Sequence, residues 1–164
     1  MVALLGTSGG DAYLEGDGAY REYSSDVQAV VDLFGPTDFT RMNDRAAAKD
    51  YSAADSPVTK FLGKSAKDAP ELAKKASPIT YVSAKNPPVL LIHGEMDDAV
   101  IIEQSEIFYD ALVKAGVKTK FVRVKNAGHG LALAQAAQGA EISPSAKEVE
   151  ADEVQWFKDS FQMK

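Results

Sequence analysis

Val89-Leu90-Leu91-Ile92-His93-Gly94 is the stretch of sequence that decides the fold. A continuous apolar run of this length is typical of a strand covered on both faces, as the strands of parallel sheets are. The pair Pro87-Pro88 leads into the run. The sequence therefore predicts a buried strand at residues 89–93 that belongs to a parallel sheet.

Two further strands and two helices are expected on either side of this run. Residues 27–34 (VQAVVDLF) are apolar and β-branched and end before a Gly-Pro pair, while residues 118–124 (KTKFVRV) alternate as a strand does. Residues 103–115 and 145–163 carry apolar stripes at helical spacing. This order predicts an α/β fold in which helices cover both faces of a three-strand parallel sheet.

The rest of the chain lacks strong strand patterns. Prolines divide residues 36–86 into short pieces such as 58–62 and 70–75, which predicts a small helical excursion between two strands. Residues 6–26 are rich in glycine and polar residues, and we expect an irregular loop there. A chain of 164 residues is long enough for one domain with a core, so residues 1–164 are interpreted as a single domain.

Composition narrows the function classes. With 45% hydrophobic and 26% charged residues, the chain is expected to be soluble. The net charge of −6 is dispersed and gives no electrostatic reason to bind nucleic acid or an anionic membrane, and no apolar run approaches the roughly 18 residues of a membrane span. The absence of cysteine excludes disulfide and thiolate chemistry but leaves the compartment open, either the cytoplasm or secretion from a bacterium.

Asp97 is the first candidate site residue, because it lies four residues after the predicted strand at 89–93. Ligand crevices of open α/β sheets lie beyond the carboxyl ends of the strands, so a carboxylate at this position is aimed at such a crevice. The alternative is that Asp97 and Asp98 only cap the following helix or a turn, since aspartate is common in loops of this kind.

His129 is the second candidate, in the segment Asn126-Ala127-Gly128-His129-Gly130 that directly follows the third predicted strand. The glycines on both sides leave its imidazole exposed. A lone histidine is usually unremarkable, and that alternative stays open for His129 taken by itself. The other histidine, His93, ends an apolar strand and is better interpreted as a packed, hydrogen-bonded residue.

Asp97 and His129 together indicate an acid and a base. They follow successive parallel strands, and neighbouring parallel strands lie about 4.8 Å apart, so the loops that follow them can touch. An aspartate that accepts from the Nδ1–H of a histidine fixes its tautomer and stabilises the imidazolium, as a general base requires. The order Asp then His is that of α/β-hydrolases, in which the serine comes first. We expect Asp97, rather than Asp98, to face His129.

Five motifs in order resemble the second half of bacterial α/β-hydrolase esterases, relatives of feruloyl and acetylxylan esterases and of small lipases. The resemblance implies a partial α/β-hydrolase fold with Asp97 as the triad acid, His129 as the base, and residues 36–81 as a small cap near the substrate. It implies no metal and no cofactor. The motifs are Gly35-Pro36-Thr37-Asp38-Phe39, Ala76-Ser77-Pro78-Ile79, residues 87–94 with Asp97, residues 105–112 with Lys114-Ala115-Gly116-Val117, and Ala127-Gly128-His129-Gly130.

Ser8 is the candidate nucleophile inside the chain, because Gly6-Thr7-Ser8-Gly9-Gly10 matches G-x-S-x-G. A nucleophile elbow must run from strand through a sharp turn to helix, yet Gly16 and Gly18 interrupt the helix expected after Ser8, at about 1 kcal/mol each relative to alanine. In similar esterases, residues like 1–8 end the helix that follows the elbow. The resemblance therefore implies a serine upstream of Met1, with Ser8 as the alternative.

Two functions from different classes follow. In the first, the chain is a carboxylic-ester hydrolase, an esterase or lipase acting on a small-molecule ester, either active through Ser8 or completed by an N-terminal half. In the second, it is a non-catalytic hydrolase remnant, folded and homo-oligomeric. The aromatic residues of the excursion line an acyl pocket or form its core, and the second interpretation is preferred for Phe39, Tyr51, Phe61 and Tyr81.

Overall fold

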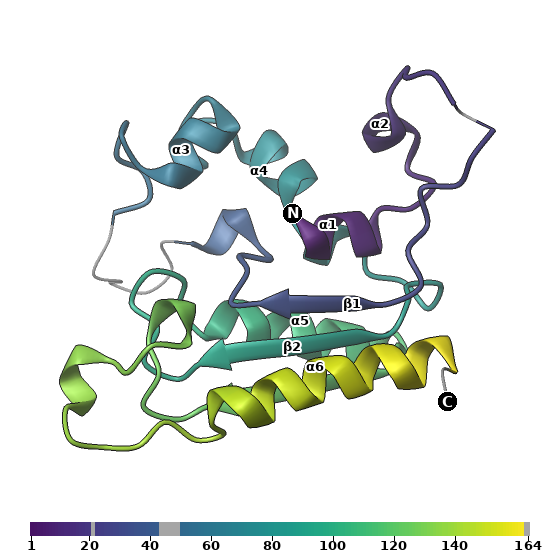
Figure 1. Ribbon diagram of the computed structural model, residues 1–164. Helices are drawn as coiled ribbons and strands as arrows, with labels where there is room; N and C mark the ends of the chain where they lie inside the picture. Colours follow the sequence, from purple (N-terminus) through teal and green to yellow (C-terminus); the bar gives the residue numbers. More distant parts are fainter. Residues whose placement is uncertain (21, 43–49, 163–164) are drawn as a thin grey trace.

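The sheet has three parallel strands in the order β1-β2-β3 (Figure 1). A computed structural model describes residues 1–20, 22–42 and 50–162 of the chain. The strands are β1 (Val30–Leu33), β2 (Val89–Gly94) and β3 (Thr119–Val124). The predicted parallel sheet is therefore confirmed, with long connections between its strands as parallel pairing requires.

β1 is shorter than predicted, four residues instead of residues 27–34. Its first ladder bond runs from the N–H of Val30 to the carbonyl of Pro88, at 2.9 Å, because the strand beside it begins only at Val89. At the other end Phe34 has a φ of 45°, which turns the backbone out of the extended conformation. The length of β1 is thus set by its neighbour and by this turn, and neither is visible in the apolar pattern.

Helices cover both faces of the sheet, and two buried clusters mark the two sides. On one side, α1 (Val2–Thr7) packs on β1 and α5 (Glu103–Lys114) packs on β2 and β3, and on the other side α6 (Ala146–Phe161) packs across β2 and β3 (Figure 1). All six residues of β2 are buried, as its continuous apolar run predicted. The first cluster contains Ala3, Val30, Val89, Leu91, Phe108, Leu112 and Val117, and the second contains Leu90, Ile92, Val122, Val124, Ala127, Val149 and Trp156.

The two long helices agree with the sequence. α5 was predicted at residues 103–115 and ends one residue earlier, with Gly116 in the left-handed region at φ 81°. α6 was predicted at residues 145–163, and Ser145 is its N-cap in a reciprocal capping box with Glu148. Residue 163 of that prediction lies outside the described part of the chain. No helix among the described residues is long and apolar enough to cross a membrane.

The segment between β1 and β2 is helical in its described parts. It contains η1 (Phe39–Arg41), α3 (Pro57–Leu62), α4 (Pro70–Ala76) and η2 (Pro78–Tyr81), while residues 43–49 of the predicted excursion lie outside the description. Tyr51 belongs to a buried cluster of this segment, and the Phe39 ring lies 5.5 Å from that of Phe61. This cluster supports the interpretation of Phe39 and Tyr51 as core residues of the excursion, whereas Phe61 is 53% exposed and does not fit it.

The first 26 residues differ from the irregular loop that was expected for residues 6–26. The apolar start of the chain continues as α1 to Thr7, and a second short helix, α2 (Ala12–Glu15), follows. Gly6 suits α1 because a Cβ there would lie 2.3 Å from a methyl group of Val30. Asp11 caps α2 by accepting from two backbone N–H groups. Close packing on Val30 therefore stabilises α1 and a side-chain cap stabilises α2, although the glycine content of this region favoured a loop.

Asp32 on β1 is a buried carboxyl group, and we predict that Asp32→Asn reveals its cost. Its Oδ2 has no hydrogen-bond partner in the described part of the chain. Burial raises its pKa to about 6, although the amino group of Met1 and His93 act in the opposite direction. The native state therefore holds this proton more tightly than the unfolded state, and stability falls as the pH rises from about 4 through 6.

Between pH 4 and pH 7, the free energy of unfolding of the wild type should fall by about 2 kcal/mol relative to that of Asp32→Asn. Urea denaturation at the two pH values measures this fall. The exposed acid Glu150 on α6, changed to Gln, is the control and should show no such shift. An equal difference between Asp32→Asn and wild type at both pH values would contradict the assignment.

Candidate active site

The loops after β2 and β3 meet at the carboxyl edge of the sheet. The N–H of Met96 donates to the carbonyl of Ala127 at 2.9 Å, and the N–H of Glu95 donates to the carbonyl of Val124 at 3.0 Å. These bonds join the loop that carries Asp97 to the loop that carries His129. The side chains of the two candidate residues are therefore placed by backbone contacts near the strand ends.

Gly94 makes this close approach possible. A Cβ on Gly94 would lie 2.4 Å from the carbonyl oxygen of Ala127 and 2.7 Å from that of Gly128. Both obstacles are backbone atoms, so no side-chain rotation relieves them. A glycine is therefore required at the end of β2, because a side chain there would push the two loops of the site apart.

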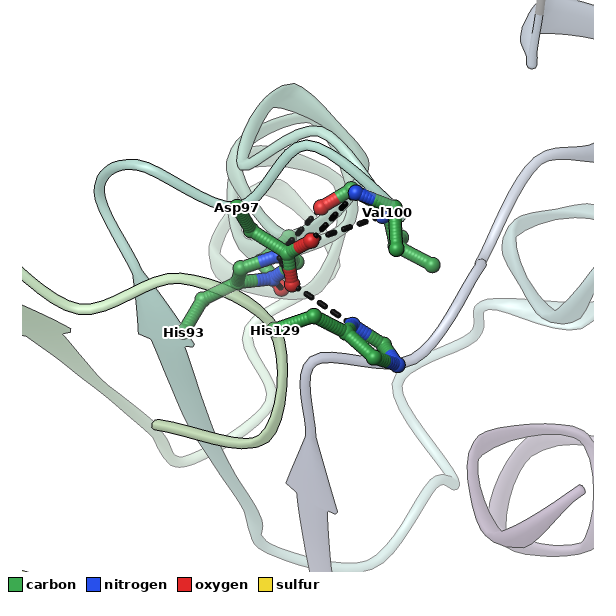
Figure 2. Close-up of polar contacts among 6 residues, drawn as sticks. His93, Asp97, Val100 and His129 are labelled. Atoms are coloured by element: carbon green, nitrogen blue, oxygen red, sulfur yellow. Dashed lines mark hydrogen bonds and ion pairs between the residues drawn. The ribbon is translucent and has the colours of Figure 1, made fainter. Parts of the chain in front are cut away.

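Asp97 and His129 form the hydrogen bond that the sequence predicted. The Nδ1 of His129 lies 2.9 Å from Oδ2 of Asp97 (Figure 2). Asp97 is buried, whereas its neighbour Asp98 is exposed. The expectation that Asp97 rather than Asp98 faces His129 is confirmed as a contact.

The Asp97 carboxylate is held by four donors. Its Oδ1 accepts from the N–H groups of Ala99 and Val100, each at 2.8 Å, and its Oδ2 is shared by His129 and, at 3.3 Å, by Nε2 of His93. Burial alone would raise the pKa of Asp97, but the hydrogen bonds from His93, His129 and the two backbone N–H groups outweigh it and lower the pKa to about 2. Asp97 is therefore an anion at neutral pH.

The His129 side chain is partly exposed to solvent. It lies in the short turn η3 (His129–Leu131), and its side chain is 44% exposed. Its Nε2 meets no hydrogen-bond partner within the residues that the structure describes, and the Phe34 ring packs edge-on against the imidazole with 4.8 Å between centroids. A proton bound or released at Nε2 is therefore accessible to a molecule at this edge.

His93 is packed and hydrogen-bonded, as its place at the end of an apolar strand predicted. Its side chain is fully buried, and Ser105, Val100 and Asp97 surround its two ring nitrogens (Figure 2). The contact of His93 with Asp97 was not predicted from the sequence. The i,i+4 spacing of the two residues was the available signal, but this spacing implies contact only when both residues lie in a helix, and His93 ends a strand. Here the turn after β2 brings the two side chains together.

Ser8 lies at the other end of the sheet. It is the C-cap of α1, and its N–H donates to the carbonyl of Leu4 at 2.9 Å, so a helix precedes it instead of the strand of an elbow. Its neighbour Thr7 accepts from the Asn86 side chain, just before β2 begins. Because a six-residue strand is about 20 Å long, the structure does not bring Ser8 to Asp97 and His129 at the opposite edge.

The fold and the site together define an α/β-hydrolase class of protein, with an aspartate and a histidine at the carboxyl edge of a parallel sheet. No group of three or more candidate metal ligands gathers within the described ranges. The comparisons with known proteins agree with this class. A model of the family named BD-FAE matches residues 1–112, and the chain belongs to that family.

The curated relatives are longer proteins. The chain is 31% identical over 137 residues to esterase LipQ of Mycobacterium tuberculosis (strain ATCC 25618 / H37Rv), a match that covers 82% of the chain and 31% of LipQ. It is 47% identical over 55 residues to the uncharacterized peptidase YuxL of Bacillus subtilis (strain 168), over 34% of the chain and 8% of YuxL. The chain thus spans about a third or less of the length of these relatives.

Solved structures show the same fold. A bifunctional GH43-CE protein of Bacteroides eggerthii superposes on 96% of the chain with a TM-score of 0.78 and 31% identity, using 21% of its own length. The acetyl ester-xyloside bifunctional hydrolase of Caldicellulosiruptor lactoaceticus covers 96% of the chain with a TM-score of 0.70 at 24% identity, over 51% of its own length. The partial α/β-hydrolase fold implied by the sequence motifs is confirmed.

We predict that Gly94→Ala destabilises the chain and disturbs the site. The added methyl group meets two backbone carbonyls, so one loop must move, and overpacking of this kind costs roughly 1–3 kcal/mol. Urea denaturation measures the loss. Gly18→Ala is the matched control because a Cβ there has nothing within 4 Å, and it should change stability little. Equal stability of the two variants would show that the loops yield easily.

Proposed function

We propose that the chain carries the acid and the base of a carboxylic-ester hydrolase that uses a Ser-His-Asp triad. The observation that carries the proposal is the 2.9 Å contact between Asp97 and His129, with the imidazole side chain 44% exposed to solvent. The family, and relatives that are named esterases, support the same reaction class.

In the proposed mechanism, His129 acts through its Nε2. That nitrogen takes the proton of a serine hydroxyl as the oxygen attacks the ester carbonyl, and later returns the proton to the leaving alcohol. Asp97 accepts from the Nδ1–H throughout and stays ionised, in keeping with its lowered pKa. Water then attacks the acyl-enzyme with the same base, so one ester and one water give one acid and one alcohol.

The nucleophile in this proposal comes from outside residues 1–164. α1 runs opposite to β1, so that its C-terminal end lies beside the start of the strand and its amino end points toward the edge that bears His129 (Figure 1). The helix after a nucleophile elbow has this direction, with the serine at its amino end. A serine supplied there, by a preceding segment or a second polypeptide, fits the site better than Ser8 does.

The proposed substrate is a small carboxylic ester, and a carbohydrate ester is the favoured kind. One solved relative, 34% identical over 79% of the chain, is a truncated form of a carbohydrate esterase from gut microbiota. The helical excursion between β1 and β2 is proposed to act as a small cap beside the substrate. Phe34, whose ring touches His129, is placed to contact whatever group binds there.

We predict that the isolated chain hydrolyses p-nitrophenyl acetate barely above background and that Ser8→Ala leaves this rate unchanged. Without its serine, a triad loses on the order of 10⁶-fold in kcat. The measurement is turnover of wild type, Ser8→Ala and His129→Ala under identical conditions. Robust turnover that Ser8→Ala abolishes would instead make Ser8 the nucleophile, and the absence of turnover even with a serine-bearing half present would favour a non-catalytic remnant.

We further propose that another chain or segment covers the outer edge of β1. Within the described residues β1 pairs only with β2, so its other side presents unpaired N–H and C=O groups, which favour strand pairing with a partner. Leu33 on this strand is 38% exposed. Exposed apolar side chains also lie on α6, namely Val154, Phe157 and Phe161. A second copy or a complementary half would bury these groups.

Sedimentation velocity at micromolar concentration tests this assembly, and we expect a dimer or larger species. If a second copy covers the edge, Leu33→Lys should shift the population toward monomer, because a lysine on an edge strand opposes pairing. Leu72→Lys on α4 is the control, since Leu72 is also 38% exposed but lies away from β1. A monodisperse wild-type monomer would show that the open edge is tolerated.

A further inference from the structure

His93 is fully buried near the end of β2, and both of its ring nitrogens have partners. Its Nδ1 lies 2.7 Å from the hydroxyl of Ser105 on α5. Its Nε2 lies 2.7 Å from the carbonyl oxygen of Val100 and 3.3 Å from Oδ2 of Asp97. The imidazole thus connects the sheet, α5 and the turn that carries Asp97 (Figure 2).

These partners determine which nitrogen bears the proton. A carbonyl and a carboxylate only accept, so Nε2 of His93 must carry a hydrogen to satisfy them. The Ser105 hydroxyl can then donate to Nδ1. Buried polar groups that are fully paired in this way define one orientation of the ring. Ser105 and Val100 hold the ring in place, and this places Nε2 3.3 Å from Oδ2 of Asp97.

We propose that His93 is a positioning residue, which turns the Asp97 carboxylate so that Oδ2 meets His129. The proposal rests on the proposed function, because it assigns to His93 an effect on the acid–base pair. Oδ1 of Asp97 is already occupied by two backbone N–H groups, and Oδ2 receives one histidine from the core and one from the solvent side. With donors on both oxygens, the carboxylate plane has little freedom to rotate.

The orientation of the Asp97 carboxylate affects His129 because His129 is partly exposed. The imidazole of His129 is 44% exposed, so little surrounding protein fixes its orientation. Its contacts are the hydrogen bond to Oδ2 of Asp97 and the packing against the Phe34 ring. A rotation of the carboxylate would therefore move the base.

The charged or titratable groups that also act here are Asp32, which interacts with His93, and Tyr51, whose pKa is raised by burial and by the charges of Asp97 and Asp98.

Two substitutions separate a positioning role from simple packing. The amide nitrogen of a glutamine reaches the place of Nε2, so His93→Gln keeps a donor toward Val100 and Asp97. An asparagine ends at the place of Nδ1, so His93→Asn keeps only the side that faces Ser105. If His93 merely fills the core, the two variants should behave alike.

NMR of the histidine-labelled chain provides the readout, together with the carboxyl titration of Asp97. We expect the Nδ1–H signal of His129 to be protected from exchange in wild type and in His93→Gln and to be lost in His93→Asn. The titration midpoint of Asp97, about 2 in wild type, should stay low in His93→Gln and rise toward the ordinary aspartate value of about 3.9 in His93→Asn.

Either of two results overturns the proposal: an unchanged His129 signal in folded His93→Asn, or equal effects of the two substitutions. Should His93→Asn fail to fold, Ser105→Ala decides, since it frees the ring with little change of volume. Weaker protection of the His129 Nδ1–H in that variant supports the positioning role, and unchanged protection refutes it. These signals do not depend on turnover, so they stand apart from any failure of the esterase assay.

Discussion

The burial of β2 on both faces is the constraint on which the rest of the structure depends. Its side chains Val89 and Leu91 pack toward α1 and α5, while Leu90 and Ile92 pack toward α6. A strand enclosed in this way has its position fixed to within the fit of its side chains. The residues that continue it, His93 and Gly94, are consequently delivered to one place at the carboxyl edge, and the candidate site is assembled around them.

The apolar pattern made the architecture predictable, because burial on both faces leaves a continuous run at 89–93 and an amphipathic stripe leaves a 3.6-residue period at 103–115. The start of β1 at Val30 was not predictable, because it depends on the register with Val89. The local pattern did not predict the helices at residues 2–7 and 12–15, because their stability comes from packing on β1 and from a cap, whereas the sequence there shows mainly glycine; for residues 2–7 the family resemblance alone implied a helix. The local preference for a loop is overcome where a residue distant in sequence packs closely in space, as Val30 does on Gly6.

The candidate site divides in the same way. Asp97 and His129 were predictable because each follows a strand, and because neighbouring parallel strands end at one edge. The contact of His93 with Asp97 was not, since it depends on the turn through residues 94–100 and on the buried face of α5 at Ser105. Sequence patterns report which element carries a residue, but they do not report how a turn folds a side chain back onto the strand before it.

Two buried carboxyl groups illustrate how the surroundings decide the charge. Asp32 and Asp97 are 3% and 7% exposed, yet the pKa of the first is raised to about 6 and that of the second is lowered to about 2. Burial acts on both in the same direction, so the difference comes from donors. Asp97 has four N–H groups around it, whereas Oδ2 of Asp32 has none in the described part of the chain. The negative charge of Asp97, which faces His129, is thus stabilised by N–H groups from β2, from the turn after β2 and from the loop after β3. Because all of these lie within residues 89–129, the contact between Asp97 and His129 is formed by two consecutive strands and their loops.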